Sequence, residues 1–263
     1  MHSALAVSAC DHGVLMWDSN KFNKGEELTI FYTNADSLHN KIHELKLVIN
    51  SLHYRPSIIA ITEVKHKTKW QTKLSEFSIS GYEMYHNDLE KFPRGIIVYV
   101  DCRLKSKQLF LNSKAVEHLI IEIQSKYTRL VLTTIYRSPS SIDENDKAIN
   151  DLITDLSSRH RGYNIIVGDF NHHIDWSNDM KPTDRSSQQF IKTMQDNFLS
   201  QNIMNPTRVR GQNEPRILDL VLTNDEIIDD IEYLSPLGKS DHAVLFLTCK
   251  FDTSCNIFHV YIQ

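Results

Sequence analysis

Residues 164–171 read Asn-Ile-Ile-Val-Gly-Asp-Phe-Asn, a short apolar run that ends in a glycine and two polar residues. The run is too uniformly apolar for a strand with one face in water, so it predicts a strand that is buried on both faces. Such strands need helices over their outer faces, which favours a layered α/β fold. Asp169 and Asn171 then lie just past a strand end, where the polar groups of an α/β fold tend to converge on one site.

Apolar runs of the same kind recur along the chain. They are rich in Ile, Val, Leu and Tyr, and we expect strands at Leu28–Thr33, Ser57–Thr62, Gly95–Val100, Val116–Ile123, Leu130–Tyr136, Asn164–Val167, Ile217–Leu222 and Ala243–Cys249. Helical periodicity appears over residues 42–52, 149–156 and 190–199. Asp184 and Ser186 are candidate caps for the last of these helices.

Neither an internal repeat nor a linker divides the chain. We therefore predict one layered α/β domain over residues 27–251, with an unmatched extension before it (residues 1–26) and an unmatched tail after it (residues 252–263). The acidic stretches Asp143–Asp155 and Asp225–Glu232 are expected to be helix or loop faces.

The composition is that of an ordinary globular chain. Its 263 residues are 41% hydrophobic and 24% charged, which excludes disordered, collagen-like and fibrous proteins. Lys and Arg number 29 against 33 Asp and Glu, and the net charge of −4 argues, taken alone, against a nucleic-acid-binding protein. The cysteines form no CxxC pair and the N-terminus lacks a basic signal-peptide region. We therefore expect an intracellular protein, in the nucleus or cytoplasm, rather than a secreted one.

Polar residues end or directly follow three other predicted strands, much as Asp169 and Asn171 follow theirs. They are Asn34, Glu63 and the pair Tyr136-Arg137. Taken singly, each such residue is more often a cap or a loop residue than part of a site. Their recurrence at one kind of position favours a shared functional site.

Asp219 stands inside the apolar run Ile-Leu-Asp-Leu-Val-Leu of residues 217–222. A buried carboxylate is costly unless it is paired or hydrogen-bonded, and a histidine is a natural partner for it. Ser240-Asp241-His242 stands directly before the last predicted strand and supplies such a histidine. Carboxylate and amide oxygens suit Mg²⁺ or Mn²⁺ better than zinc, so the whole set points to metal-assisted phosphodiester hydrolysis.

These residues, in this order, resemble those of the endonuclease/exonuclease/phosphatase superfamily, the DNase I-like fold. The most specific phrases are Gly168-Asp169-Phe170-Asn171 and Ser240-Asp241-His242. Several short motifs resemble those of the endonuclease domain of non-LTR (LINE-type) retrotransposons. They lie at residues 33–38, 61–65, 94–100, 135–139, 206–208, 218–224 and 235–242. The resemblance implies a four-layer α/β sandwich, in which two packed mixed β-sheets are flanked by helices.

The resemblance also implies an activity, that of a Mg²⁺-dependent (or Mn²⁺-dependent) DNA endonuclease. Such an enzyme nicks target DNA and leaves a 3′-hydroxyl. Its metal ligands would be Glu63, Asp241 and Asn34.

The same resemblance implies catalytic roles for five residues. Asp169 would orient or activate the attacking water or protonate the leaving oxygen, and Asn171 would help to hold that water and the phosphate. Tyr136 would donate a hydrogen bond to the scissile phosphate. His242 would contact a phosphate oxygen, and Asp219 would fix its tautomer.

Four further residues are candidates for substrate binding: Ser240, Arg137, Lys65 and Arg208. Lys65 opens a basic stretch at residues 65–73, and Arg208 opens another at residues 208–216. Each stretch is either a solvated loop or a rim that contacts phosphates.

Two features depart from the family pattern. Arg94 stands where a second glycine is common, and we expect this change to touch no catalytic residue. A full-length element would carry a reverse-transcriptase domain, whereas here we expect an isolated, monomeric endonuclease domain with DNA as its partner and no membrane contact.

The alternatives are an AP endonuclease or other phosphoesterase of the same fold, and a catalytically inactive remnant that binds DNA.

Overall fold

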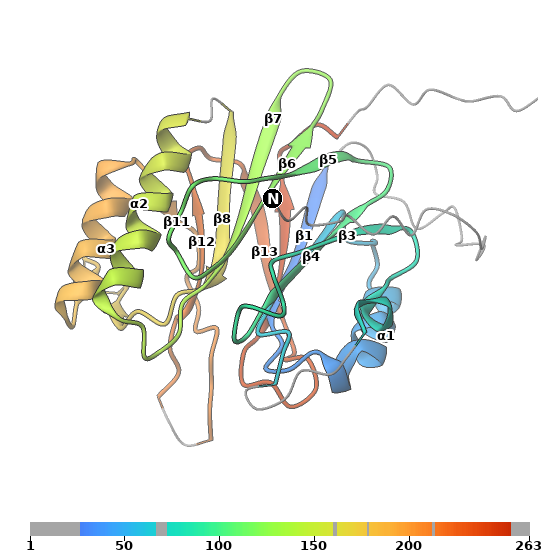
Figure 1. Cartoon of the computed structure of the whole chain (residues 1–263), viewed down its shortest axis with the longest axis horizontal. Helices are drawn as coiled ribbons and strands as arrows, with labels where there is room; N and C mark the ends of the chain where they lie inside the picture. Colours follow the sequence, from blue (N-terminus) through green and yellow to red (C-terminus); the bar gives the residue numbers. More distant parts are fainter. Residues whose placement is uncertain (1–26, 67–72, 160–161, 178, 212–213, 254–263) are drawn as a thin grey trace, which may run out of the picture.

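A computed structural model describes residues 27–66, 73–159, 162–177, 179–211 and 214–253. The predicted extension over residues 1–26 and most of the predicted tail lie outside these ranges. Within them the strands form two six-stranded sheets and a two-stranded ribbon, and three α-helices cover the sheets (Figure 1).

The first sheet has the strand order β13-β14-β1-β2-β4-β3. Its strands are β1 (Leu28–Asn34), β2 (Ile58–Thr62), β3 (Tyr82–His86), β4 (Ile96–Asp101), β13 (Ile228–Leu234) and β14 (Val244–Cys249). The second sheet has the order β11-β12-β8-β7-β6-β5. Its strands are β5 (Lys105–Leu109), β6 (Glu117–Gln124), β7 (Arg129–Tyr136), β8 (Tyr163–Asp169), β11 (Ser200–Gln201) and β12 (Asp219–Thr223).

The remaining elements are the ribbon, the helices and two short 3₁₀ turns. The ribbon pairs β9 (Ile174–Asp175) with β10 (Lys181–Pro182). The helices are α1 (Ile42–Ser51), α2 (Asp143–Arg159) and α3 (Arg185–Asp196), and the 3₁₀ turns are η2 (His39–Lys41) and η3 (Leu74–Phe77). The Asp184 carboxylate caps α3 by accepting a hydrogen bond from the Ser187 N–H at 2.7 Å. None of the described helices is both long and apolar enough to cross a membrane.

The predicted four-layer sandwich is confirmed. Alternate residues of the strands face opposite sides, so that Leu28 and Ile30 of β1 lie in the core between the sheets while Phe31 packs under α1. On the opposite outer face, Ile166 of β8 packs in a cluster with residues of α2 and α3. Figure 1 shows α1 on one side of the paired sheets and α2 and α3 on the other.

Four strands of the two large sheets were not predicted, and all of them carry polar residues at a sheet edge. They are β3 and β13 in the first sheet and β5 and β11 in the second. The expectation of a helix or loop face over Asp225–Glu232 is therefore wrong for most of that stretch. The sequence Ile-Asp-Asp-Ile-Glu-Tyr-Leu of β13 fits an edge, because charged side chains discourage a further strand from pairing there.

Candidate active site

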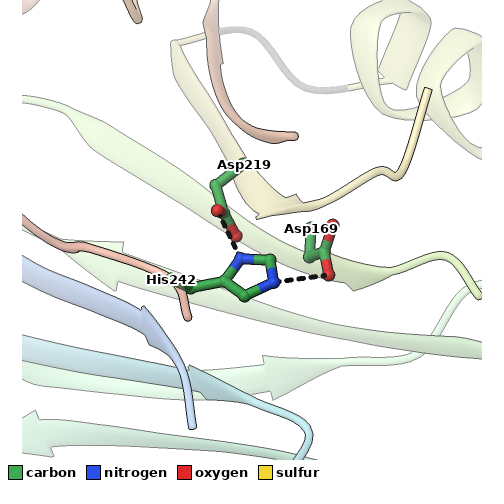
Figure 2. Close-up of side chains that lie close together, drawn as sticks. All are labelled: Asp169, Asp219 and His242. Carbon is green, nitrogen blue, oxygen red and sulfur yellow. Dashed lines mark hydrogen bonds and ion pairs between the residues drawn. The ribbon is translucent and has the colours of Figure 1, made fainter. Parts of the chain in front are cut away.

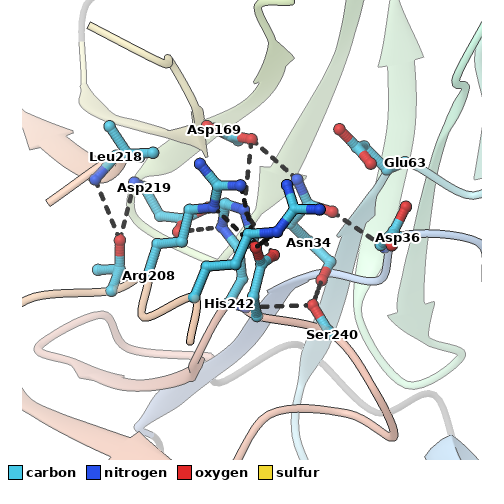
Figure 3. A network of polar contacts seen from close by, with 12 residues as sticks. Asn34, Asp36, Glu63, Asp169, Arg208, Leu218, Asp219, Ser240 and His242 are labelled. Atoms are coloured by element: carbon cyan, nitrogen blue, oxygen red, sulfur yellow. Dashed lines mark hydrogen bonds and ion pairs between the residues drawn. The ribbon is translucent and has the colours of Figure 1, made fainter. Parts of the chain in front are cut away.

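The predicted site residues come together at one edge of the two sheets because of the strand directions. Strand β1 runs parallel to β2, and β7 runs parallel to β8, so all four end at this edge. Strands β12 and β14 run antiparallel to their neighbours and begin there. The edge therefore collects Asn34, Glu63, Tyr136, Asp169, Asp219 and His242, several of which Figure 3 shows facing one another.

The backbone turns sharply where the strands end. Asp36, Glu63 and Asn171 have φ of 38°, 53° and 48°, a region that non-glycine residues occupy at a cost of about 1–3 kcal/mol. Gly168 is required for a different reason, because a Cβ there would lie 1.9 Å from the carbonyl oxygen of Ile135 on the adjacent strand. Glycine thus lets β8 lie against β7 directly before Asp169.

Asp219 and His242 form a buried pair (Figure 2). The imidazole Nδ1 lies 2.7 Å from Asp219 Oδ2, and the Tyr32 hydroxyl donates to Oδ1 of the same carboxylate at 2.8 Å. Asp219 is 0% exposed and His242 is 4% exposed. Burial lowers the pKa of His242, but the Asp219 carboxylate outweighs burial and raises that pKa to about 9. The imidazole is therefore a cation at neutral pH, with Nδ1–H donating to Asp219.

Asp169 lies directly opposite Asp219 in the pairing of β8 with β12. Its Oδ2 accepts a hydrogen bond from the Asn34 amide at 2.8 Å and lies 3.9 Å from His242 Nε2. Its Oδ1 accepts from the Asn171 N–H at 3.2 Å. Burial, and then the nearby Asp219 carboxylate, raises the pKa of Asp169 to about 7. A carboxyl group with this pKa can accept and return a proton near neutral pH.

Two hydroxyl groups hold these residues in place. The Ser240 hydroxyl donates to the carbonyl oxygen of Asn34 at 2.7 Å and accepts from the His242 N–H at 3.2 Å. The Thr207 hydroxyl accepts from the N–H groups of Leu218 and Asp219 at 3.1 and 3.0 Å. Ser240, a predicted substrate contact, is buried and ties the start of β14 to the end of β1. Sequence reasoning did not identify Thr207 and Tyr32 as site residues. Nothing in the sequence around them shows that their hydroxyl groups bond to residues of the site.

Arg94 contacts Glu63, which was predicted as a metal ligand rather than as a catalytic residue. Its Nη2 donates to Glu63 Oε2 and, at 2.8 Å, to Asp36 Oδ1. Arg94 is 5% exposed, whereas the Asp36 side chain is 56% exposed. Asp36 was not singled out from the sequence, although its place two residues after Asn34 is a signal that could have found it.

Asp241 has arginine partners of its own. Arg208 Nε and Nη2 lie 3.0 and 2.9 Å from Asp241 Oδ2, and Arg210 Nε lies 3.9 Å from the same oxygen. Asp241 Oδ1 lies 3.6 Å from His242 Nε2. The predicted metal ligand Asp241 and the predicted substrate contact Arg208 are therefore paired with each other at the rim of the site.

Arg137 is occupied inside the protein rather than facing the site. Its Nε and Nη2 form a bidentate pair with Asp146 of α2 at 2.7 and 2.8 Å, and its Nη1 donates to the carbonyl oxygens of Phe170 and Asn171. Both partners of the ion pair are almost fully buried, at 8% and 6% side-chain exposure. The structure thus gives Arg137 a structural use, which is to anchor the loop after β8 to α2.

The other predicted residues are also largely buried. The Lys65 ammonium donates to the carbonyl oxygen of Leu89, so it points into the protein, and residues 67–72 of its basic stretch lie outside the described residues. The Asn171 amide donates to the carbonyl oxygen of Arg137 at 2.8 Å. Tyr136 is 4% exposed, and burial, followed by Asp169, raises the pKa of its hydroxyl above the ordinary value.

Among the residues that the structure describes, two groups of side chains have the chemistry to hold a cation. Ligand atoms of Asp169, Asp219 and His242 lie within 4.8 Å of one another. In that group, however, Nδ1 and both Asp219 oxygens already have hydrogen-bonding partners. Asp36 and Glu63 form the second group, and it already surrounds a positive charge, the Arg94 guanidinium. Because its donors are carboxylate oxygens, it matches the preference of Mg²⁺.

One family of known proteins matches the second half of the chain. The family described as endonuclease-reverse transcriptase matches residues 130–246. A search of the curated proteins gives no match.

Several solved structures have the same fold. The endonuclease domain of TRAS1, a telomere-specific non-LTR retrotransposon, is 16% identical with a TM-score of 0.63, over 85% of this chain and 99% of that one. AP endonuclease LMAP from Leishmania major is 14% identical with a TM-score of 0.66, over 94% and 96%. The 3′ phosphatase NExo from Neisseria, solved with a product DNA hairpin, is 15% identical with a TM-score of 0.64, over 86% and 99%.

At these identities the solved structures establish the fold, and the family match adds the link to reverse-transcriptase elements. The chain therefore has the fold of these solved structures, the endonuclease domain of TRAS1 among them, and its residues 130–246 match the endonuclease-reverse transcriptase family.

Proposed function

We propose that the protein is a Mg²⁺-dependent DNA endonuclease of the non-LTR retrotransposon type, which nicks one strand of target DNA and leaves a 3′-hydroxyl. The observation that carries the proposal is the buried Asp219–His242 pair beside Asp169, whose pKa lies near 7. This arrangement presents a proton acceptor and a fixed cation side by side, and both groups accelerate phosphodiester hydrolysis. An intracellular site of action, in the nucleus or cytoplasm, is part of the proposal.

The two sides of the site have separate tasks. A water molecule adds to phosphorus and its proton passes to the Asp169 carboxylate. The bond between phosphorus and O3′ breaks, and O3′ takes up a proton from solvent water, which leaves a 3′-hydroxyl on one nucleotide and a 5′-phosphate on the next. Nε2–H of the His242 cation faces the phosphate and offsets the charge that develops on its oxygens. Asp219 accepts the Nδ1–H hydrogen bond and favours the protonated imidazole, so that the cation presents Nε2–H outward.

Glu63, Asp36, Asp241 and Asn34 would hold the metal ion, since they supply carboxylate and amide oxygens at the same edge. When bound there, Mg²⁺ stabilises negative charge on the phosphoryl oxygen. Tyr136, at the end of β7, would donate a hydrogen bond to the phosphate.

Nicking of supercoiled plasmid tests the proposal. With Mg²⁺ present we expect open-circular product, and we expect DNA polymerase to extend the nick because it carries a 3′-hydroxyl. Chelation of the metal, Asp169→Ala and His242→Ala should each abolish the product. Arg103→Gln is the matched control, because the exposed Arg103 pairs with Asp101 outside the site. Equal nicking by wild type and both site variants would overturn the proposal.

The second candidate is an AP endonuclease, because LMAP from Leishmania major and an AP endonuclease from Archaeoglobus fulgidus have the same fold. An abasic-site plasmid, an intact plasmid and a phosphoinositide, assayed side by side, distinguish the alternatives. Cleavage of the abasic plasmid alone would replace the retrotransposon-type assignment with AP endonuclease activity. DNA binding without cleavage of any substrate would indicate an inactive remnant.

A further inference from the structure

Arg94 places a positive charge between the carboxylates of Glu63 and Asp36, which form the open side of the site. A single nitrogen, Nη2, contacts both Glu63 Oε2 and Asp36 Oδ1. Figure 3 shows Glu63 and Asp36 together on one side of Asn34, away from the Asp219–His242 pair. The guanidinium therefore lies where the carboxylate oxygens of these two residues converge.

The backbone of Arg94 is fixed at this position from both sides. Its N–H and that of Gly95 donate to the two oxygens of the buried Glu117 carboxylate, at 3.1 and 2.5 Å. Its carbonyl oxygen accepts from the Lys65 N–H at 2.7 Å, two residues after Glu63. Arg94 is thus held beside Glu63 by the fold, and its contact with Glu63 does not depend on a mobile loop.

The contact of Arg94 with Glu63 has a less favourable geometry than the buried ion pair between Arg137 and Asp146. Arg137 offers two nitrogens to the two oxygens of Asp146, the bidentate geometry that makes such pairs strong. Arg94 uses Nη2 alone for both carboxylates, and its buried Nε has no hydrogen-bonding partner among the described residues. The guanidinium is therefore attracted to the two carboxylates without being locked between them.

A divalent ion and this guanidinium compete for the same carboxylate oxygens. Mg²⁺ binds carboxylate oxygens at about 2.0–2.1 Å, closer than an N–H donor can approach, so one oxygen cannot direct the same lone pair to both. Asp36 is 56% exposed, which leaves an open side toward which the guanidinium can move.

We propose that Arg94 is an internal cation that occupies the site between Asp36 and Glu63 in the metal-free protein, and that a divalent metal ion binds by displacing its guanidinium. The inference rests on the metal site of the proposed function. Arg94 keeps the two carboxylates paired while no ion is bound, and it lowers the affinity of the site for the ion. Loss of the positive charge should raise that affinity, while a lysine should largely preserve the competition.

The test is calorimetric titration of Mn²⁺ into the metal-free full chain, without DNA. Arg94→Gln should bind about 10-fold or more tightly than wild type, within the usual range of coupling between two ligands of one site. Arg94→Lys should stay near wild type, and Arg103→Gln, which removes an exposed arginine elsewhere, should not change the affinity.

Thermal unfolding supplies a second measurement that needs no activity. Metal-free Arg94→Gln leaves two neighbouring carboxylates without the guanidinium, so saturating Mn²⁺ should raise its melting temperature more than that of wild type. Equal affinities and equal shifts in wild type and Arg94→Gln would overturn the role of Arg94 and leave the metal site standing. Absence of Mn²⁺ binding in both proteins would overturn the metal site and the inference together.

Discussion

The two sides of the candidate site neutralise their carboxylates in different ways. On the closed side, Asp219 is fully buried and is hydrogen-bonded to both His242 and Tyr32. On the open side, Glu63 shares one arginine nitrogen with Asp36, whose side chain is more than half exposed. The first arrangement fixes a proton in place, whereas the second leaves a cation that can be exchanged. Each side thus has the degree of closure that its proposed task requires.

The largest effect is expected on the closed side, from Asp169→Asn. Loss of the proton acceptor should slow plasmid nicking by about 10³-fold, within the usual range for general base catalysis. A rate within about 10-fold of wild type would remove Asp169 from the chemistry.

The same variant should be more stable than wild type at pH 8. The pKa of Asp169 is raised to about 7, so its contribution to stability is complete below its ordinary pKa near 4 and is lost as the pH rises through 7. An amide does not ionise and avoids that loss. Urea denaturation at pH 8 measures the gain in the free energy of unfolding. A less stable variant would show that hydrogen bonds and the His242 cation stabilise the Asp169 carboxylate more than its burial destabilises it.

Arg137→Ala tests whether an arginine at the edge of the site serves the fold or the substrate. It leaves the buried Asp146 carboxylate without its arginine, which should lower the free energy of unfolding by about 3–5 kcal/mol. The double variant Arg137→Met/Asp146→Leu should recover much of that loss, because neither charge then remains buried.

DNA affinity distinguishes the two roles of Arg137. Since its guanidinium is occupied by Asp146 and two carbonyl oxygens, the double variant should keep the salt dependence of DNA binding found in wild type. If the slope of log affinity against log salt concentration is instead smaller by about one in the variant, Arg137 contacts a phosphate.

Asp219→Asn should remove the charge that keeps the His242 imidazole protonated. In wild type burial lowers the pKa of His242, but Asp219, with smaller contributions from Asp169 and Asp241, raises it to about 9; without the Asp219 charge the pKa should fall markedly. NMR titration of the imidazole in the metal-free protein measures both values. An unchanged pKa would show that another group holds the proton.

The stability of wild type should decline with pH for the same reason. Because the pKa of His242 is raised, the stabilising contribution of the pair is complete below about pH 6.5 and is lost as the pH rises through about 9. Between about pH 7.5 and about pH 9.5 this decline should be present in wild type and absent in Asp219→Asn, as followed by urea denaturation.

The smallest effect is expected from Ser240→Ala, which removes the hydrogen bond that the Ser240 hydroxyl donates to the carbonyl oxygen of Asn34. The loss should be about 1 kcal/mol of stability, the usual contribution of one such bond. DNA affinity should change less than about twofold if Ser240 only positions Asn34 and His242. A large loss of affinity without a loss of stability would return Ser240 to the substrate contacts.

Much of the fold could be predicted from the sequence, because buried strands and amphipathic helices have distinctive periodicities. The strands that contribute the site, such as Asn164–Val167, were found within two residues of their observed ends. The four edge strands were missed, since an edge strand has one unpaired side and can carry polar or charged residues that hide the pattern.

The sequence by itself determined which residues of the candidate site could matter, because carboxylates that recur at strand ends and an aspartate inside an apolar run stand out from the local pattern. What only the tertiary structure decided is how each charge is compensated. Arg94 and Glu63 are 31 residues apart, yet they meet, and Arg137 turns from the site toward Asp146. The physical reason is that ion pairs depend on distance in space and on burial, neither of which follows from local sequence pattern.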